Sequence, residues 1–167
     1  MQIVVNDTNI FLDLINADLL DHFFQLPFEV HTTDFVISEI EEPDQTMIVQ
    51  QLIDNRKLTV GTSTISELVE ISEMQNQNGG LSIEDCSVWR YSKRNKFMIL
   101  SGDGLLTKTA RKDGLIVRGV LFVFDELVNQ NVITAKLAAE KLELILLMGS
   151  RLPKKECDQR LQQWRNI

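Results

Sequence analysis

The sequence has little cysteine and no long apolar run, and these absences exclude several classes of protein. Only 2 of the 167 residues are cysteines. Cys86 and Cys157 lie far apart and match no metal-ligand spacing, so we expect reduced thiols and no disulfide framework. The longest apolar stretches, such as residues 144–148, are too short to cross a bilayer, and the amino terminus lacks the basic segment of a signal peptide. These features predict a cytoplasmic protein with no membrane partner.

Basic residues are scarce in the first half of the chain. The net charge is −7, which by itself argues against a nucleic-acid partner because such binding rests on lysine and arginine. Residues 1–89 hold 2 basic and 16 acidic residues, whereas residues 90–167 hold 15 basic and 8 acidic ones. This division suits an enzyme whose acidic site collects cations while a basic surface holds an anionic substrate. An ordinary mixed surface explains it equally well.

The order of apolar patterns predicts an α/β fold. A chain of this length with 44% hydrophobic residues is typical of one domain with its own core. Strands and helices alternate, which indicates a parallel sheet with helices on both faces. Strands are expected at residues 3–6, 28–33, 58–61, 97–101 and 115–117. Helices are expected at residues 9–19, 35–42, 64–77, 105–112, 120–129, 135–148 and 154–164. Two further helices are expected to begin at residues 44 and 82.

Several residues are expected to begin these helices or to form an apolar helix face. The predicted N-caps include Asp34, Asp44 and Thr134, and Pro153 is expected at the first position of the last helix. The apolar face of the helix at residues 64–77 would consist of Ile65, Leu68, Val69 and Ile71.

Two aspartates follow predicted strands. Asp7 comes directly after residues 3–6, and Asp103 follows residues 97–101 by one glycine. Both should project from the carboxyl ends of strands, where open α/β sheets place their sites. If the two strands are neighbours, both carboxylates face one crevice. Each aspartate alone is also typical of a helix N-cap or a turn.

Two short motifs add to this pattern. In Ser101-Gly102-Asp103-Gly104, the flanking glycines let the backbone turn sharply and leave the carboxylate unshielded. In Ser82-Ile83-Glu84-Asp85, the serine can cap a helix that holds Asp85 at its third position, close to the positive end of the helix dipole. Asp85 is therefore compatible with capping, with chemistry or with both.

Four motifs together resemble those of the PIN-domain nucleases, especially the VapC-type toxins of toxin–antitoxin pairs. They are Asp7-Thr8-Asn9-Ile10-Phe11-Leu12, similar to the family's Asp-x-Asn signature, then Val36-Ile37-Ser38-Glu39-Ile40, Ser82-Ile83-Glu84-Asp85 and Ile99-Leu100-Ser101-Gly102-Asp103-Gly104-Leu105-Leu106. Order and approximate spacing agree over residues 2–118. The resemblance implies a PIN-like three-layer sandwich over residues 1–167, with a core at about 2–118 and a helical C-terminal extension at about 119–167.

The resemblance also implies a metal-dependent endoribonuclease. Its catalytic and metal-binding residues would be Asp7, Glu39, Asp85 and Asp103, the first and last as direct ligands. The candidates for substrate contact or for support of these ligands would be Thr8, Asn9 and Ser101. Clustered carboxylates suit Mg²⁺ or Mn²⁺, which take oxygen ligands and can acidify a water for attack on phosphorus.

Some of these assignments stay open in the sequence. Glu39 has close rivals at residues 41–42, and Asp85 has one in Glu84. Many family members carry another acid or amide shortly after the last aspartate, where residues 105–106 of this chain are leucines. Whether one metal ion binds or two is therefore undecided.

The partners follow from the resemblance alone. It favours RNA over DNA, a small antitoxin that covers or enters the acidic pocket, and a homodimer. The apolar helices near residues 44–54 and 135–148 could supply a dimer interface or belong to the core. The alternative is a PIN-like module that binds nucleic acid or protein without cutting, although the intact set of four acids favours an enzyme. A receiver-like signalling domain would need paired acids after the first strand and a late lysine, which we cannot place.

Basic residues at 90–96 and 108–118 bracket the predicted strand that precedes Asp103. They could contact a phosphate backbone, or they could interact favourably with the negative ends of helix dipoles. The aromatic side chains that could stack on bases are Trp89, Tyr91 and Trp164. A packing role is favoured for Trp89, and a packing or surface role for His22 and His31.

Overall fold

A five-stranded parallel sheet organises the computed structural model, which describes residues 1–166. The strand order is β3-β2-β1-β4-β5. The strands are β1 (Gln2–Asn6), β2 (Phe28–Thr33), β3 (Leu58–Gly61), β4 (Met98–Leu100) and β5 (Val117–Arg118). The predicted bounds are correct for β2 and β3, whereas β5 lies further along the chain than residues 115–117. The α/β class predicted from the sequence is confirmed.

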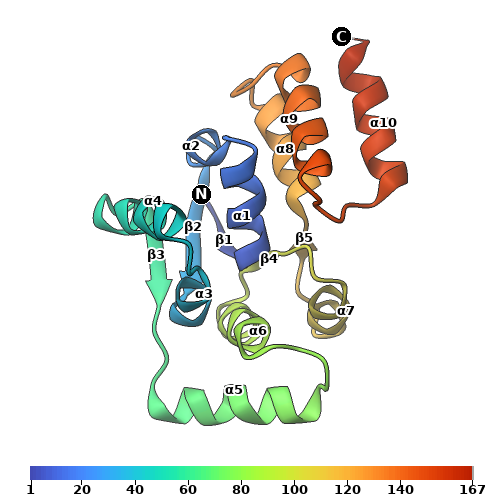
Figure 1. Ribbon diagram of the computed structural model, residues 1–167. Coiled ribbons are helices and arrows are strands. Elements are labelled where there is room, and N and C mark those ends of the chain that lie inside the picture. The colour runs from blue at the N-terminus through green and yellow to red at the C-terminus, as the bar shows by residue number, and fades with distance from the viewer. Residues whose placement is uncertain (167) are drawn as a thin grey trace.

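Helices cover both faces of the sheet (Figure 1). They are α1 (Thr8–Asn16), α2 (Leu20–Phe23), α3 (Asp34–Glu39), α4 (Pro43–Asp54), α5 (Ile65–Gln77), α6 (Ile83–Asn95), α7 (Gly104–Lys112), α8 (Val120–Asn129), α9 (Ala135–Leu147) and α10 (Lys154–Arg165). Alternating side chains of β2 show the two layers, because successive residues of a strand point to opposite faces. His31 contacts Tyr91 of α6, whereas the ring of Phe28 packs against Phe23 of α2 and Phe122 of α8. The predicted three-layer arrangement is therefore confirmed.

Three predicted helix starts are wrong by one or two residues. Thr33 is the N-cap of α3, and its side chain accepts a hydrogen bond from the Val36 backbone N–H, so Asp34 is already helical. Pro43 begins α4 after Glu42, in place of a helix capped by Asp44. Proline suits a first helical turn because that position needs no backbone N–H donor. Pro153 is the N-cap of α10 and not its first residue.

Two predicted helices end three residues earlier than expected. The helix expected over residues 9–19 ends at Asn16, and Asp18 has a left-handed backbone with φ of 53° before the short α2 begins. The helix expected over residues 35–42 ends at Glu39, because Ile40 is already extended.

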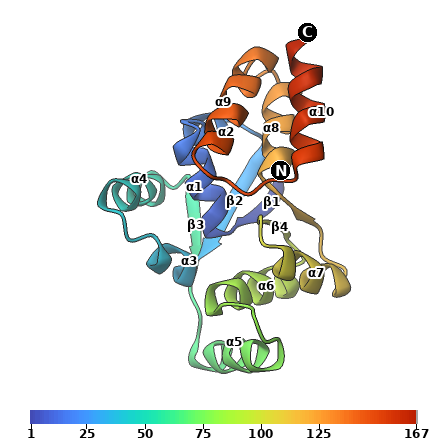
Figure 2. The same cartoon turned by 45° about the vertical axis from the view of Figure 1, so that its right-hand side comes forward.

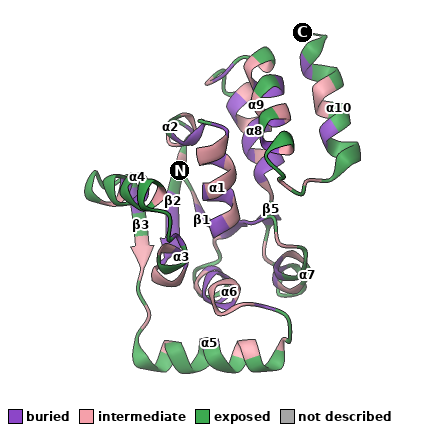
Figure 3. Ribbon diagram, viewed as in Figure 1, coloured by how far each residue is buried: buried purple, intermediate pink, exposed green. Residues whose placement is uncertain are grey.

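The apolar face predicted for α5 is mostly exposed. Ile71 is buried, whereas Ile65 is 83% and Val69 54% exposed. Figure 3 shows α5 mainly in the colour of exposed residues, and Figure 1 places it beyond α6 at one end of the molecule. α5 packs chiefly against α6. Its periodicity was therefore a poor guide to burial.

The last three helices lie at the opposite end from α5. Both Figure 1 and Figure 2 show α10 beside α9, and α9 packs in turn on α8 and α1. The ring of Trp164 stacks on Phe124 with centroids 6.2 Å apart, which joins α10 to α8. Among the helices of residues 1–166, none has the length and apolar character needed to cross a bilayer.

Candidate functional site

Asp7 and Asp103 lie at the same edge of the sheet. β1 and β4 are parallel neighbours, with Asn6 paired to Leu100, and the Asp7 backbone N–H donates to the Leu100 carbonyl at 2.9 Å. Asp7 is the N-cap of α1, and its Oδ1 accepts a hydrogen bond from the Thr8 backbone N–H at 2.8 Å. Asp103 caps α7, with Oδ1 accepting from the Leu106 N–H at 2.6 Å. Both aspartates thus cap helices, and that role also aims their carboxylates at the same edge.

Ser101 and Asn9 join the two aspartate loops. The Ser101 hydroxyl donates to Asp7 Oδ2 at 2.6 Å and accepts from the Asp103 backbone N–H at 3.0 Å. Asn9 donates from Nδ2 to Asp7 Oδ2 at 2.7 Å and accepts at Oδ1 from the Gly102 N–H at 2.8 Å. A side chain at Gly102 would bring a Cβ within 3.2 Å of Asn9 Oδ1, so glycine permits this close approach. These contacts fix the position of the Asp7 carboxylate.

Glu39 and Asp85 approach the same pair of aspartates from two other helices. The Thr8 hydroxyl donates a hydrogen bond to Glu39 Oε2 at the end of α3. Asp85 sits in a capping box with Ser82 at the start of α6, where each residue's side chain accepts from the other's backbone N–H. The capping interpretation of Asp85 is therefore correct, and the charges of Asp103 and Glu39 still act on its carboxylate.

The pKa shifts show that the four carboxylates influence one another. Burial raises the pKa of Asp7 to about 6; the Ser101 hydrogen bond opposes this, and the charges of Asp85 and Glu39 add to it. Burial also raises the pKa of Asp85, with further contributions from the charges of Asp103 and Glu39. Asp7 is only 4% exposed. The fold therefore brings the charges of Glu39 and Asp85 to bear on Asp7, whose burial leaves this repulsion poorly screened by water.

The oxygen donors of the four carboxylates fit the ligand preference of Mg²⁺ or Mn²⁺. Within residues 1–166, no three His, Cys, Asp or Glu side chains lie close enough together to hold a metal ion between them. Zinc usually takes three or four protein ligands of nitrogen or sulfur. Mg²⁺ usually keeps several waters and binds through one or two carboxylates. The carboxylate oxygens and the concentrated negative charge match the second behaviour.

Comparison with known proteins decides the family. The profile of the protein family DUF3368, described as a PIN domain, matches residues 3–166. This chain belongs to the PIN-domain family. PIN domains are in general nucleases, so the family is of the nuclease type. No curated protein sequence matches the chain significantly.

Two solved structures are similar to this PIN domain. PAE2754 from Pyrobaculum aerophilum matches with a TM-score of 0.55 and 15% sequence identity, over 77% of this chain and 98% of that chain. A PilT N-terminus domain protein, SSO1118, from the hyperthermophilic archaeon Sulfolobus solfataricus P2 matches with a TM-score of 0.47 and 8% identity, over 76% of this chain and 94% of that chain. The first likeness shows a shared fold. Neither assigns an activity to this PIN domain.

Arg90, Lys93 and Arg94, three of the basic residues considered for phosphate binding, form ion pairs within the protein. Arg90 is buried and contacts Glu67 at 3.0 Å and Glu70 at 2.6 Å on α5. Lys93 contacts Asp113 at 2.9 Å. These side chains hold α5 and the turn after α7 against α6, so the charge of residues 90–93 is largely neutralised within the protein.

The aromatic and histidine side chains considered for binding are mostly part of the core. Trp89 and Trp164 are buried, and the Trp89 indole N–H donates to Asp113 at 2.9 Å. His31 is buried and lies 2.9 Å from both the Tyr91 hydroxyl and a Glu29 oxygen. The packing role expected for Trp89 and the packing alternative for His31 are confirmed.

Asn6 is a residue beside the site that sequence reasoning missed. It is fully buried, and neither atom of its side-chain amide has a hydrogen-bond partner within residues 1–166. The signal was an amide at the end of an otherwise apolar buried strand, since such groups normally find partners. The unpaired amide lies directly before Asp7 in the chain.

Replacing Ser101 by alanine is expected to raise the pKa of Asp7 above its value of about 6. The Ser101 hydroxyl donates to the ionised carboxylate, so its loss favours the protonated form. The measurement is a carbon-13 NMR titration of the Asp7 carboxyl group in EDTA. Ser66→Ala, on the exposed surface of α5, is the matched control and should leave this pKa unchanged. An equal pKa in Ser101→Ala and the parent protein would contradict the expectation.

Proposed function

We propose that this PIN domain is a metal-dependent endoribonuclease that hydrolyses phosphodiester bonds with Mg²⁺ or Mn²⁺ bound at Asp7, Asp103, Asp85 and Glu39. The observation that carries the proposal is the placing of Asp7 and Asp103 at the same edge of the sheet, joined through the Ser101 hydroxyl, with the charges of Glu39 and Asp85 acting on the same site. Carboxylates gathered in this way are most stable when a cation neutralises them.

The hydrogen bonds around the aspartates indicate which oxygens would bind the cation. Each carboxylate oxygen has two lone pairs. Asp7 Oδ2 already accepts from Asn9 and Ser101, whereas Oδ1 accepts only from the Thr8 N–H. Asp7 Oδ1 therefore keeps capacity for a metal ligand bond. For Asp103, binding through Oδ2 leaves the Oδ1 cap of Leu106 intact.

The remaining acids would act through water. Glu39 and Asp85 would accept hydrogen bonds from waters around the cation, which spreads the ligand set beyond the two direct ligands. The bound cation would supply Lewis acidity and lower the pKa of a water that attacks the phosphorus. Asn9 and Ser101 would hold the Asp7 carboxylate in one orientation during this step.

The choice of RNA and of partners rests on the VapC-like motif around Asp7. We infer a toxin of a toxin–antitoxin pair, with the antitoxin covering the acidic edge. A homodimer is the further expectation, and exposed apolar side chains support a surface for it. Met47 of α4 is 56% exposed and Leu147 of α9 is 87% exposed, although the same helices also bury Leu52 and Leu142 in the core.

Hydrolysis assays with matched nucleic acids test the proposal. Purified protein is incubated with single-stranded RNA and DNA of the same sequence in Mg²⁺, Mn²⁺ or EDTA. We expect cleavage of RNA in either metal and none in EDTA. Cleavage that persists in EDTA, or no cleavage of either strand in metal, would rule out the mechanism, and cleavage of DNA alone would rule out the assignment to RNA.

A further inference from the structure

A groove lined by arginines begins at Ser101 and Gly102, in the loop between β4 and Asp103. It has a volume of about 420 Å³. We call it the arginine groove and define it by Ser101, Gly102, Arg111, Arg118, Arg151 and Arg160. Ser101 and Gly102 contact Asp7 and Asn9 directly, so one end of the groove adjoins the acidic site. The other walls come from β5, the start of α8, and the loop between α9 and α10.

Arg160 is neutralised within the protein. Its Nη2 lies 2.6 Å from one oxygen of Asp125, and its Nε lies 2.8 Å from the other. Glu156 adds a third contact at 3.8 Å. The bidentate pair raises the pKa of Arg160 and fixes α10 against α8. Arg160 therefore stabilises the fold, and its charge offsets two acids of the groove, Asp125 and Glu156.

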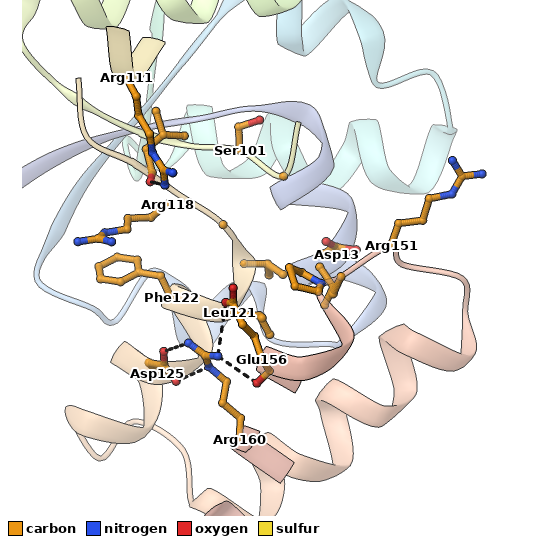
Figure 4. Close-up of a pocket in the computed structure, with 16 residues that line it drawn as sticks. Asp13, Ser101, Arg111, Arg118, Leu121, Phe122, Asp125, Arg151, Glu156 and Arg160 are labelled. Atoms are coloured by element: carbon orange, nitrogen blue, oxygen red, sulfur yellow. Dashed lines mark hydrogen bonds and ion pairs between the residues drawn. The ribbon is translucent and has the colours of Figure 1, made fainter. Parts of the chain in front are cut away.

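The charges of the other three arginines are not balanced by carboxylates of residues 1–166. Among residues 1–166, no carboxylate forms an ion pair with Arg111, Arg118 or Arg151. Arg111 donates to the Val117 carbonyl at 2.9 Å, and the Arg118 guanidinium lies over the ring of Phe122 at 5.7 Å. Figure 4 shows the ends of Arg118 and Arg151 directed away from the ion pairs of Arg160.

The third acid of the groove is Asp13, so four arginines face three acids. Asp13 accepts a hydrogen bond from the Ser150 hydroxyl, and burial raises its pKa. The groove therefore has a surplus of positive charge on exposed side chains, directly beside a site of concentrated negative charge. A nucleic-acid strand fits both, because its phosphates can pair with the arginines and share a cation with the carboxylates.

We propose that the arginine groove binds phosphates of a nucleic-acid strand to one side of the bond that the acidic site cleaves, with Arg118 and Arg151 as the main contacts. The inference rests on the proposed function. A planar guanidinium matches two phosphate oxygens, and contacts of this kind position a strand without reading its sequence. Arg151 lies in the loop before α10, so the C-terminal helices take part in substrate binding.

Binding measured without hydrolysis tests this assignment. Fluorescence anisotropy of a labelled single-stranded RNA is followed in EDTA over a series of KCl concentrations. The double variant Arg118→Gln/Arg151→Gln should bind about tenfold more weakly, and its plot of log affinity against log salt should be shallower by about 1.4, because each lost phosphate contact on a single strand lowers the slope by about 0.7. Each single variant should show about half of that change in slope.

The matched control removes two charges at the opposite edge of the sheet. Arg56 and Lys57 are exposed and precede β3 at its amino end. The variant Arg56→Gln/Lys57→Gln should bind with the parent affinity and slope. An equal loss in the two double variants would mean that only bulk charge matters, and this would overturn the proposal. Circular dichroism spectra verify that all variants fold.

The outcomes separate this inference from the proposed function. Arginine-dependent binding of RNA with no cleavage in Mg²⁺ or Mn²⁺ would rule out the proposed nuclease activity. The groove would then remain a nucleic-acid-binding site. If the parent protein cleaves RNA and the groove variants bind RNA as tightly as the parent, only the phosphate-binding role of the groove would be ruled out. Tighter, arginine-dependent binding of poly-glutamate than of RNA would assign the groove to an acidic protein and would also overturn the proposal.

Discussion

Asp7→Asn is expected to lower the rate of phosphodiester hydrolysis by about a thousandfold or more, because it removes the charge of a carboxylate that we propose as a direct metal ligand. The substitution preserves shape, and Oδ1 of the asparagine can still accept from the Thr8 N–H and cap α1. The new amide does replace the Oδ2 acceptor of Asn9 and Ser101. We therefore expect a folded protein whose acidic site has lost most of its affinity for the cation.

The measurement is the initial rate of RNA cleavage in Mn²⁺, beside Asp103→Asn and a surface control. Asp103→Asn should cause a loss of the same order, because it removes the charge of the second proposed metal ligand. Asp158→Asn, on the exposed face of α10, should keep the parent rate. Full activity of Asp7→Asn would remove the basis of the mechanism, and equal losses in all three variants would point to unfolding.

Metal-free protein is expected to lose about 3 kcal/mol of unfolding free energy as the pH rises from 4 to 8, because of Asp7 alone. The pKa of Asp7 is about 6 in the folded protein, against the model value of 3.8. A raised pKa means that the folded state holds the proton more tightly than the unfolded chain. The stabilisation is therefore complete below pH 4 and disappears as the pH passes through 6. Asp85 and Asp13 have raised pKa values and act in the same direction.

Urea denaturation in EDTA at a series of pH values measures this dependence. In Asp7→Asn the slope between pH 4 and 7 should fall, because the largest contributor no longer titrates. Adding Mg²⁺ to the parent protein at pH 8 should raise its stability, since a cation that binds only the folded state stabilises it by mass action. A parent protein whose stability rises steadily from pH 4 to 8 would contradict the raised pKa of Asp7.

Short sequence patterns predicted most helices and strands. They gave the wrong residue where either of two neighbours could cap or begin a helix. The strands β2 and β3 were correct because short β-branched runs bounded by polar residues leave few alternatives. Thr33 and Asp34 can both cap a helix, and Thr33 takes the role because β2 stays extended up to that residue. Pro43 can follow one helix or begin the next, and here it begins α4. The choice depends on the path of the backbone.

Burial and ion pairing depended on neighbours that are distant in the sequence. The apolar residues of α5 had the spacing of a core-facing helix, yet α5 lies outside α6 and exposes Ile65 and Val69. Arg90 was a candidate for phosphate binding, and acids on α5 engage it instead. Arg151, far along the chain, comes to line the groove beside Ser101. None of these outcomes is encoded within a few residues.

The sequence by itself determined the α/β class, the four acidic motifs and the placing of Asp7 and Asp103 after strands, because strand alternation, caps and turns depend on residues within about four positions. Only the tertiary structure decided the strand order. It set β1 beside β4, so that Ser101 reaches Asp7 across 94 residues of chain. Burial at that edge then raised the pKa of Asp7, an effect of desolvation and neighbouring charge that exists only once the chain has folded.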